Sequence, residues 1–110
     1  MIRAHRLGRG KELDLLFTRG RRFHSPFFQI AVRTRAASDA GPSRFVFVVP
    51  KSVDKRAVVR NRLRRRACEY IRRRITSMPR ADIAITVKKG AAGATRADFY
   101  AGLQEILARI

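Results

Sequence analysis

AVVRNRLRRRACEYIR, residues 57–72, is the stretch that decides the fold. Apolar residues recur in it at helical spacing: Val59, Leu63, Ala67, Tyr70 and Ile71. At about 100° per residue these side chains form a single stripe, and the pattern predicts a helix over residues 55–75. A helix with one apolar stripe buries that stripe against another layer of structure, so we expect strands nearby in the sequence.

Strand patterns lie on both sides of this helix. Residues 44–49 read RFVFVV, a β-branched and aromatic run that predicts a central strand, and Pro50 ends it because proline cannot donate to the ladder. Residues 82–88 (DIAITVK) and 27–33 (FFQIAVR) alternate in the manner of further strands. The unit from Phe45 through the long helix to Val87 is compatible with a parallel βαβ crossover.

Shorter helices are expected at the two ends of the chain. Apolar side chains share one face over residues 10–19, which predicts a short helix. Residues 90–95 are expected to form a loop, after which Thr95 is the N-cap of a last helix with Asp98 as its capping-box partner. The expected buried side of that helix consists of Phe99, Leu103, Ile106 and Leu107. The order of elements predicts a mixed sandwich of helices and strands in one domain.

The charge of the chain is extreme and localised. Its 110 residues contain 26 Lys and Arg against 8 Asp and Glu, a net charge of +18, and most of the basic residues are arginine. Eleven basic and two acidic residues fall within residues 51–74. Such a field is neutralised by a polyanion, and guanidinium groups bind phosphate oxygens in a fork. Nucleic acid is therefore the expected partner, and an anionic membrane surface is the lesser alternative.

The candidate RNA contacts lie at or within the start of the long helix. Like charges four residues apart, such as Arg62 and Arg66, destabilise a helix unless a counter-charge is supplied, which favours a bound polyanion over a merely solvated face. The candidates are Lys51, Lys55, Arg56, Arg60, Asn61, Arg62, Arg64 and Arg65.

No catalytic or metal site is expected within the chain. His5 and His24 have no partner at a suitable spacing, and Cys68 is interpreted as a packing residue. Glu12 and Asp14 are two residues apart and point away from each other on a helix. One cysteine excludes a disulfide framework, no apolar run is long enough to span a membrane, and the expected compartment is the cytoplasm.

Aromatic residues are interleaved with arginines near the first predicted strand. Packing in the core is the ordinary interpretation of most of them. Stacking on the bases of single-stranded RNA remains open for Phe17 or Phe27, because arginines nearby would follow the RNA backbone.

The segment Ala57–Arg72 resembles the signature helix of the bacterial ribonuclease P protein subunit, through Arg60-Asn61-Arg62 and the basic and apolar residues that follow it. The resemblance covers the chain from about Arg6 to Ile110. Other matching features are Arg6-Leu7 with Phe17 and Gly20, Lys51 after the central strand, Asp82-Ile83-Ala84-Ile85 as a strand, and Phe99 with Leu103 in the final helix.

This resemblance implies an α+β fold, a two-layer αβββαβα sandwich of the ribosomal protein S5 domain 2-like type. The fold has a left-handed βαβ crossover, an exception to the usual right-handed rule. Its additional short strand would lie near residues 22–25. Residues 1–110 would form a single RNA-binding domain.

The resemblance also implies a function, the 5′ maturation of precursor tRNA by a ribonucleoprotein endonuclease. The partner RNA would be the catalyst and would hold the Mg²⁺ ions, one protein would bind per RNA, and no residue of the protein would be catalytic. Leu13 and Ala31 stand where many members of the family have aromatic residues. The candidate contacts with the precursor's 5′ leader are Leu13, Phe17, Phe27, Lys88 and Lys89. The alternative is a structural RNA-binding protein of ribosomal type without a role in cleavage.

Overall fold

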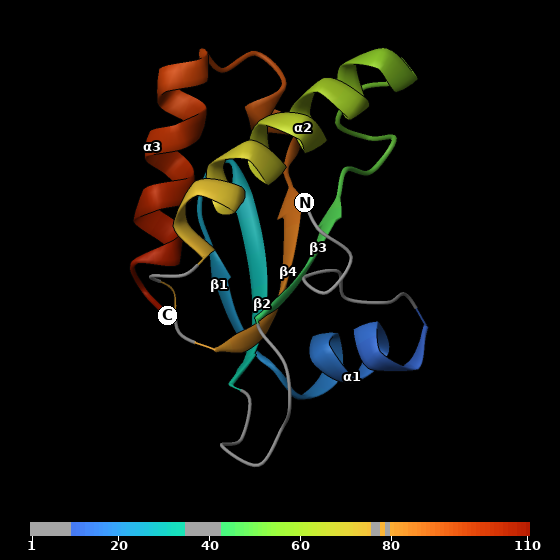
Figure 1. Ribbon diagram of the computed structural model, residues 1–110. Coiled ribbons are helices and arrows are strands. Elements are labelled where there is room, and N and C mark those ends of the chain that lie inside the picture. Colours follow the sequence, from blue (N-terminus) through green and yellow to red (C-terminus); the bar gives the residue numbers. More distant parts are fainter. Residues whose placement is uncertain (1–9, 35–42, 76–77, 79) are drawn as a thin grey trace.

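A four-stranded sheet with helices on both faces forms the body of the protein (Figure 1). The computed structural model describes residues 10–34, 43–75, 78 and 80–110. The elements are α1 (Lys11–Arg19), β1 (Arg21–His24), β2 (Phe28–Thr34), β3 (Arg44–Val48), α2 (Ala57–Arg74), β4 (Ala81–Val87), the 3-10 turn η3 (Lys89–Ala91) and α3 (Arg96–Leu107). The order of helices and strands expected from the resemblance is confirmed.

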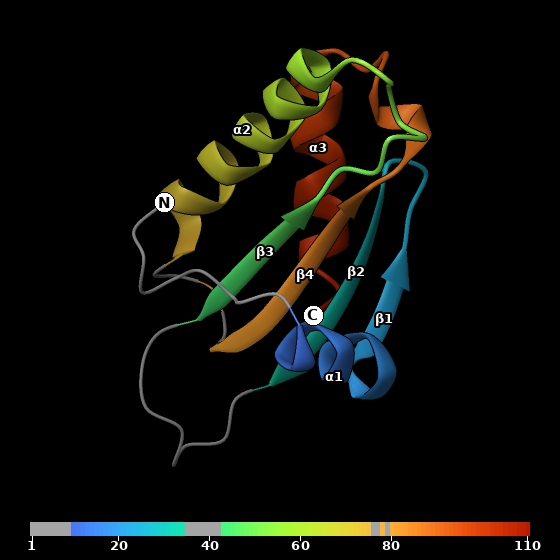
Figure 2. The same ribbon diagram turned by 90° about the vertical axis from the view of Figure 1, so that its right-hand side faces the viewer.

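The strands are arranged in the order β1-β2-β4-β3. β2 pairs antiparallel with both β1 and β4, whereas β3 and β4 are parallel neighbours joined through α2. In Figure 2, β3 and β4 both point upward, β4 lies to the right of β3, and α1 covers the near face of the sheet. Because α2 packs on the opposite face, the crossover is left-handed, as the resemblance implied.

The face of the sheet that packs against α2 and α3 carries the main core. Alternate strand residues point to it, and Phe28, Phe45, Ile83 and Ile85 are almost fully buried there. Phe28 meets Phe99 of α3 edge to face, with the ring centroids 5.0 Å apart. The α2 residues in this core are Val59, Leu63, Ala67, Tyr70 and Ile71, the stripe expected from the sequence.

The opposite face of the sheet is covered by α1 through a small cluster. Leu16 packs there against Ala31, Val46 and Ala84, which are all buried. The small side chains let α1 lie close to the sheet. Gly20, directly after the helix, is equally constrained, because a Cβ at this position would stand 2.4 Å from the carbonyl oxygen of Leu16.

Several predicted boundaries differ slightly from the structure. β2 begins at Phe28 rather than Phe27, α2 begins at Ala57 rather than at residue 55, and β4 runs one residue earlier than expected. The segment predicted as a loop contains η3, and Leu107 is only half-buried. Thr95 caps α3 as expected, since its hydroxyl accepts the Asp98 N–H at 3.1 Å. The expectations for His5 and Arg6-Leu7 lie outside the described residues.

Candidate nucleic-acid interface

The buried stripe of α2 determines where its basic residues point. Because one side of the helix is fixed in the core, Arg62 and Arg65 are exposed, and Arg64 is half-buried at the edge of the stripe. Lys51 and Lys55 are exposed in the turn that leads into the helix. A cationic surface therefore extends along the outer side of α2 from the turn before it.

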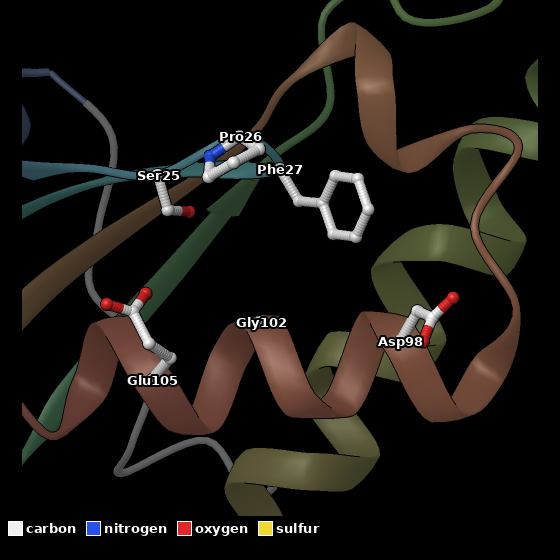
Figure 3. Close-up of a pocket in the computed structure, with 6 residues that line it drawn as sticks. All are labelled: Ser25, Pro26, Phe27, Asp98, Gly102 and Glu105. Carbon is white, nitrogen blue, oxygen red and sulfur yellow. The ribbon is translucent and has the colours of Figure 1, made fainter.

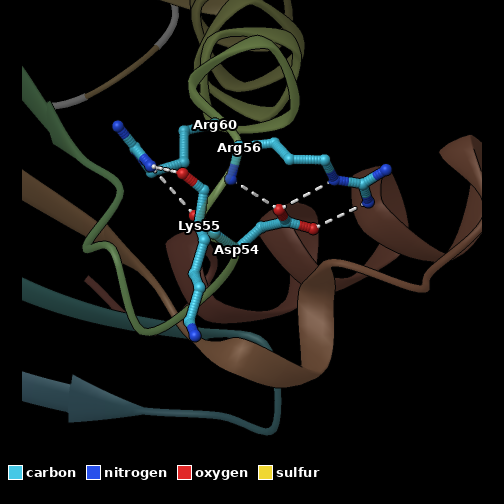
Figure 4. Close-up of polar contacts among 4 residues, drawn as sticks. All are labelled: Asp54, Lys55, Arg56 and Arg60. Atoms are coloured by element: carbon cyan, nitrogen blue, oxygen red, sulfur yellow. Dashed lines mark hydrogen bonds and ion pairs between the residues drawn. The ribbon is translucent and has the colours of Figure 1, made fainter.

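Asp54 organises that turn by binding Arg56 in two ways (Figure 4). Its Oδ1 accepts the backbone N–H of Arg56 at 2.9 Å and the Nε–H at 3.1 Å, while Oδ2 accepts Nη2–H at 3.0 Å. The side-chain hydrogen bond with Arg56 is the main reason that the pKa of Asp54 falls to about 2. The Arg56 charge is therefore partly neutralised by its own chain.

Arg60, the first arginine of the Arg-Asn-Arg motif, folds back onto the same turn (Figure 4). Its Nη1 donates to the carbonyl oxygens of Asp54, at 3.0 Å, and Lys55, at 2.8 Å. These carbonyls precede the helix, so Arg60 ties the turn to the first part of α2. Its guanidinium has a structural task in addition to any contact with RNA.

The remaining arginines of α2 differ in their partners. Nη1 of Arg64 donates to Oδ1 of Asn61 at 3.0 Å, which holds the amide beside the guanidinium. Further along, Glu69 accepts hydrogen bonds from Arg72 at 2.7 Å and Arg73 at 3.1 Å, and the bond with Arg72 is the main cause of its lowered pKa. The N-terminal half of the helix lacks such a carboxylate, so its charge remains available.

A second basic and aromatic surface lies beside α1. Leu13 and Phe17 are half-buried against the cluster on that face of the sheet. Arg22 of β1 donates from Nε to the carbonyl oxygen of Phe17 at 3.0 Å, and also from Nη2, and its Cζ lies 5.9 Å from the centroid of the Phe17 ring. Ala31, in the same cluster, is fully buried.

The sheet continues this surface beyond α1. The register places Gln29, Thr86 and Val48 in one row across the three strands β2, β4 and β3. Each is two residues from an alanine or valine of the cluster under α1, so all three point to the α1 side, and all are half-buried. Sequence reasoning missed this row, although the alternation around Ala31 indicated which side Gln29 faces, whereas Arg22 is one of the arginines expected from the sequence to follow an RNA backbone.

Lys88 and Lys89 follow β4 directly at that end of the sheet. Lys88 is half-buried and its Nζ donates to the carbonyl oxygen of Ser25 at 3.0 Å, whereas Lys89 is exposed at the start of η3. Alternation from Thr86 places Lys88 on the α1 side of the sheet, whereas Lys89 begins η3, whose Ala91 packs in the core on the α2 and α3 face. Along β4, Thr86 of the row lies between Ala84 of the cluster under α1 and Lys88.

The Phe27 ring turns away from the α1 side, although the carbonyl oxygen of Phe27 accepts the backbone N–H of Lys88 at 2.7 Å. The ring points toward α3 and lines a pocket of about 390 Å³ with Ser25, Pro26, Asp98, Gly102 and Glu105 (Figure 3). It meets Phe28 edge to face, with 6.4 Å between the ring centroids. The structure therefore places Leu13 and Phe17 in the cluster on the α1 side of the sheet, and it turns the Phe27 ring to the other side, where η3 also packs through Ala91.

Four carboxylates of the described chain are held by arginines. Asp54 pairs with Arg56, and Glu69 with Arg72 and Arg73. The other two pairs are Arg44 with Asp82 and Arg109 with Glu105.

Across the described ranges, no three His, Cys, Asp or Glu side chains gather as metal ligands would, and no helix is long and apolar enough to cross a membrane.

Comparison with known proteins agrees with this architecture over the whole chain. The family model described as Ribonuclease P matches residues 1–110. The chain belongs to the ribonuclease P family. The ribonuclease P protein component of Gluconacetobacter diazotrophicus is 35% identical over 107 residues, which cover 96% of this chain and 90% of that protein. The ribonuclease P protein component of Microcystis aeruginosa is 38% identical over 69 residues, or 62% of this chain and 58% of that protein.

A solved structure of the ribonuclease P family shares the fold. The ribonuclease P protein of Thermotoga maritima superposes with a TM-score of 0.83 at 24% identity, covering 96% of each chain. The identity is low, so the superposition shows that the sandwich is the fold of this ribonuclease P family member and carries no residue roles.

Proposed function

We propose that this chain is the protein subunit of ribonuclease P. It binds the catalytic RNA through α2 and the turn before it, and the 5′ leader of precursor tRNA through the α1 side of the sheet. In doing so it assists the endonucleolytic removal of the leader that gives the mature tRNA 5′ end. The proposal includes one protein per RNA in the cytoplasm.

The observation that carries the proposal is the uncompensated charge of α2 within a family member. Lys51, Lys55, Arg62 and Arg65 are exposed and pair with no carboxylate of the described chain. Counterion release makes such a surface bind a polyanion strongly at low salt. Arg60 and Arg56 support this surface by fixing the turn that presents it.

The leader contacts proposed on the α1 side combine rings, polar groups and cations. Phe17 has a guanidinium beside its ring, Gln29 and Thr86 offer hydrogen bonds, and Lys88 and Lys89 carry positive charge at the end of the sheet. A single strand needs these three kinds of group, because its bases stack while its phosphates are neutralised. Phe27 belongs to the proposal as a contact for a leader that crosses to the α3 side.

The catalytic Mg²⁺ ions are proposed to be held mainly by the partner RNA. In the protein, the arginine that pairs with each of Asp54, Glu69, Asp82 and Glu105 competes with a cation for the carboxylate. Residues of the chain accordingly bind and orient RNA in this proposal, and the cleavage step takes place on the RNA.

Reconstitution tests the proposal and separates it from a structural RNA-binding protein of ribosomal type. The chain is mixed with the ribonuclease P RNA of a relative and with precursor tRNA at low Mg²⁺ concentration. We expect cleavage at the mature 5′ end to require both components, with activity saturating at one protein per RNA. Cleavage by the RNA alone that the protein does not stimulate contradicts the proposal, as does cleavage by the purified protein without RNA.

A further inference from the structure

A pocket between α2 and α3 adjoins the cationic surface of α2 and shares Arg62 and Arg65 with it. Its volume is about 390 Å³, within the range of pockets that bind small molecules. The residues that α2 contributes are three, four and seven positions apart and therefore share one side of the helix. The lining consists of Arg62, Arg65, Arg66, Glu69, Arg96 and Tyr100.

The pocket is strongly cationic. Four guanidinium groups face one carboxylate, and that carboxylate, Glu69, already accepts hydrogen bonds from Arg72 and Arg73. Within the described chain no acidic side chain pairs with the four arginines of the lining. In addition, the Nε of Arg66 is buried and meets no acceptor there. A buried donor without a partner is destabilising, and the oxygens of an anion would satisfy it.

Tyr100 gives the pocket an aromatic wall. Its ring lies 5.6 Å from that of Tyr70, tilted by 38°, and meets Phe99 edge to face at 6.2 Å. Arg74 covers Tyr70, with its Cζ 3.9 Å from the ring centroid. These neighbours hold Tyr100 in place while its own side chain stays half-exposed. A ring fixed in this way provides a stacking surface for a planar group.

We propose that this pocket binds one unpaired nucleotide of the partner RNA, with its phosphate on the arginines and its base against Tyr100. The inference rests on the proposed function and adds Arg66, Arg96 and Tyr100 to the RNA contacts. Arginine forks fit phosphate oxygens, and a base can reach an aromatic ring only when it is not stacked within a duplex. A nucleotide in RNA fits better than a free one because the cationic surface continues along α2 and would accept adjoining phosphates.

The contribution of the base is tested with the full chain and two synthetic probes, a uridine hexamer and its abasic counterpart. Stacking is worth about 1–3 kcal/mol per base, so Tyr100→Leu should weaken binding of the hexamer at least about fivefold. Tyr100→Phe keeps the ring and should bind the hexamer as the unaltered chain does. Equal weakening for the hexamer and the abasic strand in Tyr100→Leu would overturn the proposal.

The contribution of the arginines is tested with Arg96→Ala, which removes an exposed side chain and leaves the core intact. Arg33→Ala, at the far end of β2 and also exposed, is the matched control for the removal of one charge. Arg96→Ala should lower the salt slope of hexamer binding by about 0.7, the value for one neutralised phosphate on a single strand. An equal effect in Arg33→Ala indicates diffuse attraction and overturns the proposal.

The site itself is followed by the NMR signal of the Arg66 Nε–H. This signal should shift when the hexamer is added and stay in place when uridine 5′-monophosphate is added at the same concentration. A shift with the mononucleotide at equal affinity assigns the pocket to a free nucleotide instead of RNA, and no shift with either probe refutes binding there. These assays contain no catalytic RNA. Binding in the pocket can therefore fail while reconstituted cleavage succeeds, and reconstituted cleavage can fail while the pocket binds the hexamer, so the two proposals are tested separately.

Discussion

The two faces of the sheet use the same alternating strands for different purposes. On the α2 and α3 face, large side chains such as Phe28, Phe45 and Ile83 fill a continuous core. On the α1 face, Ala31 and Ala84 keep the buried cluster small, and the row formed by Gln29, Thr86 and Val48 stays half-buried. The comparison teaches that stability is concentrated on one side of this protein, while the other side keeps polar and aromatic groups accessible for binding.

The largest expected effect comes from the core face. Leu63→Ala removes a fully buried α2 side chain and should lower the free energy of unfolding by about 2–5 kcal/mol, because a cavity is left. Denaturant titration followed by circular dichroism measures it. Val58→Ala, nearer the start of the same helix and 69% exposed, is the control and should change the value by less than about 0.5 kcal/mol. If both variants lower the free energy of unfolding equally, burial of Leu63 in the core on the α2 and α3 face does not account for the stability assigned to that face.

On the α1 face the effect should appear in binding rather than in folding. Phe17→Ala should reduce the affinity of the reconstituted enzyme for precursor tRNA by about 1–3 kcal/mol, the value of stacking on one base. Precursors with leaders of one, four and eight nucleotides show whether this reduction grows with the leader, and thermal unfolding shows whether the variant remains folded.

The same series of leaders decides the role of Phe27. If the increase in affinity with leader length survives in Phe17→Ala and disappears in Phe27→Ala, the leader runs over the α3 side. If both variants retain the full increase, neither ring contacts the leader, and binding must be assigned to polar groups.

A smaller and more specific contrast exists within α2. Arg62→Ala combined with Arg65→Ala should reduce the salt slope of RNA binding by about 0.7–0.9 for each phosphate that the variant no longer neutralises, with little change in stability. Arg60→Ala should instead lower the free energy of unfolding by about 1–2 kcal/mol, because it removes the hydrogen bonds to the carbonyls of Asp54 and Lys55. RNA binding at several salt concentrations measures the slope, and denaturant titration measures the free energy of unfolding. If Arg60→Ala instead lowers the salt slope and the double variant lowers the free energy of unfolding, Arg60 is the main RNA-binding arginine.

The smallest expected effect concerns pH. The pKa of Asp54 is about 2 in the folded chain and 3.8 in its ordinary state, so its contribution to stability is present above about pH 4 and is lost as the pH falls toward 2. Carboxyl NMR titration of Asp54 should give a midpoint near 2, and Arg56→Ala should raise that midpoint toward the ordinary value. A midpoint that does not move in the variant shows that another group holds the carboxylate ionised.

The main elements could be predicted because each depends on a local pattern. The stripe from Val59 to Ile71 predicted α2, the alternation of Phe28, Ile30 and Val32 predicted β2, and Thr95 predicted the start of α3. The parts of the site that depend on the path of the backbone were not predictable. The fold-back of Arg60 requires the carbonyls of the preceding turn.

Features that arise from packing between distant elements also escaped sequence reasoning. Arg96 and Tyr100 are more than thirty residues from Arg62, and only the packing of α3 beside α2 brings them into one pocket. Phe27 was grouped with Phe17 because the two are close in sequence. The strand begins only at Phe28, so the alternation does not apply to Phe27, and its ring turns to the α3 side.

The edge strand β1 has a further consequence for the protein before it meets RNA. Its outer side has no neighbouring strand within the described chain, yet three of its four residues, Arg21, Arg22 and His24, are exposed and two of them are permanently charged. Charged side chains on a free edge oppose pairing with the edge of a second copy, because the two sets of cations would face each other. The arginines of this strand therefore also act against edge-to-edge aggregation, and replacing them with apolar residues would be expected to lower solubility even where folding is unaffected.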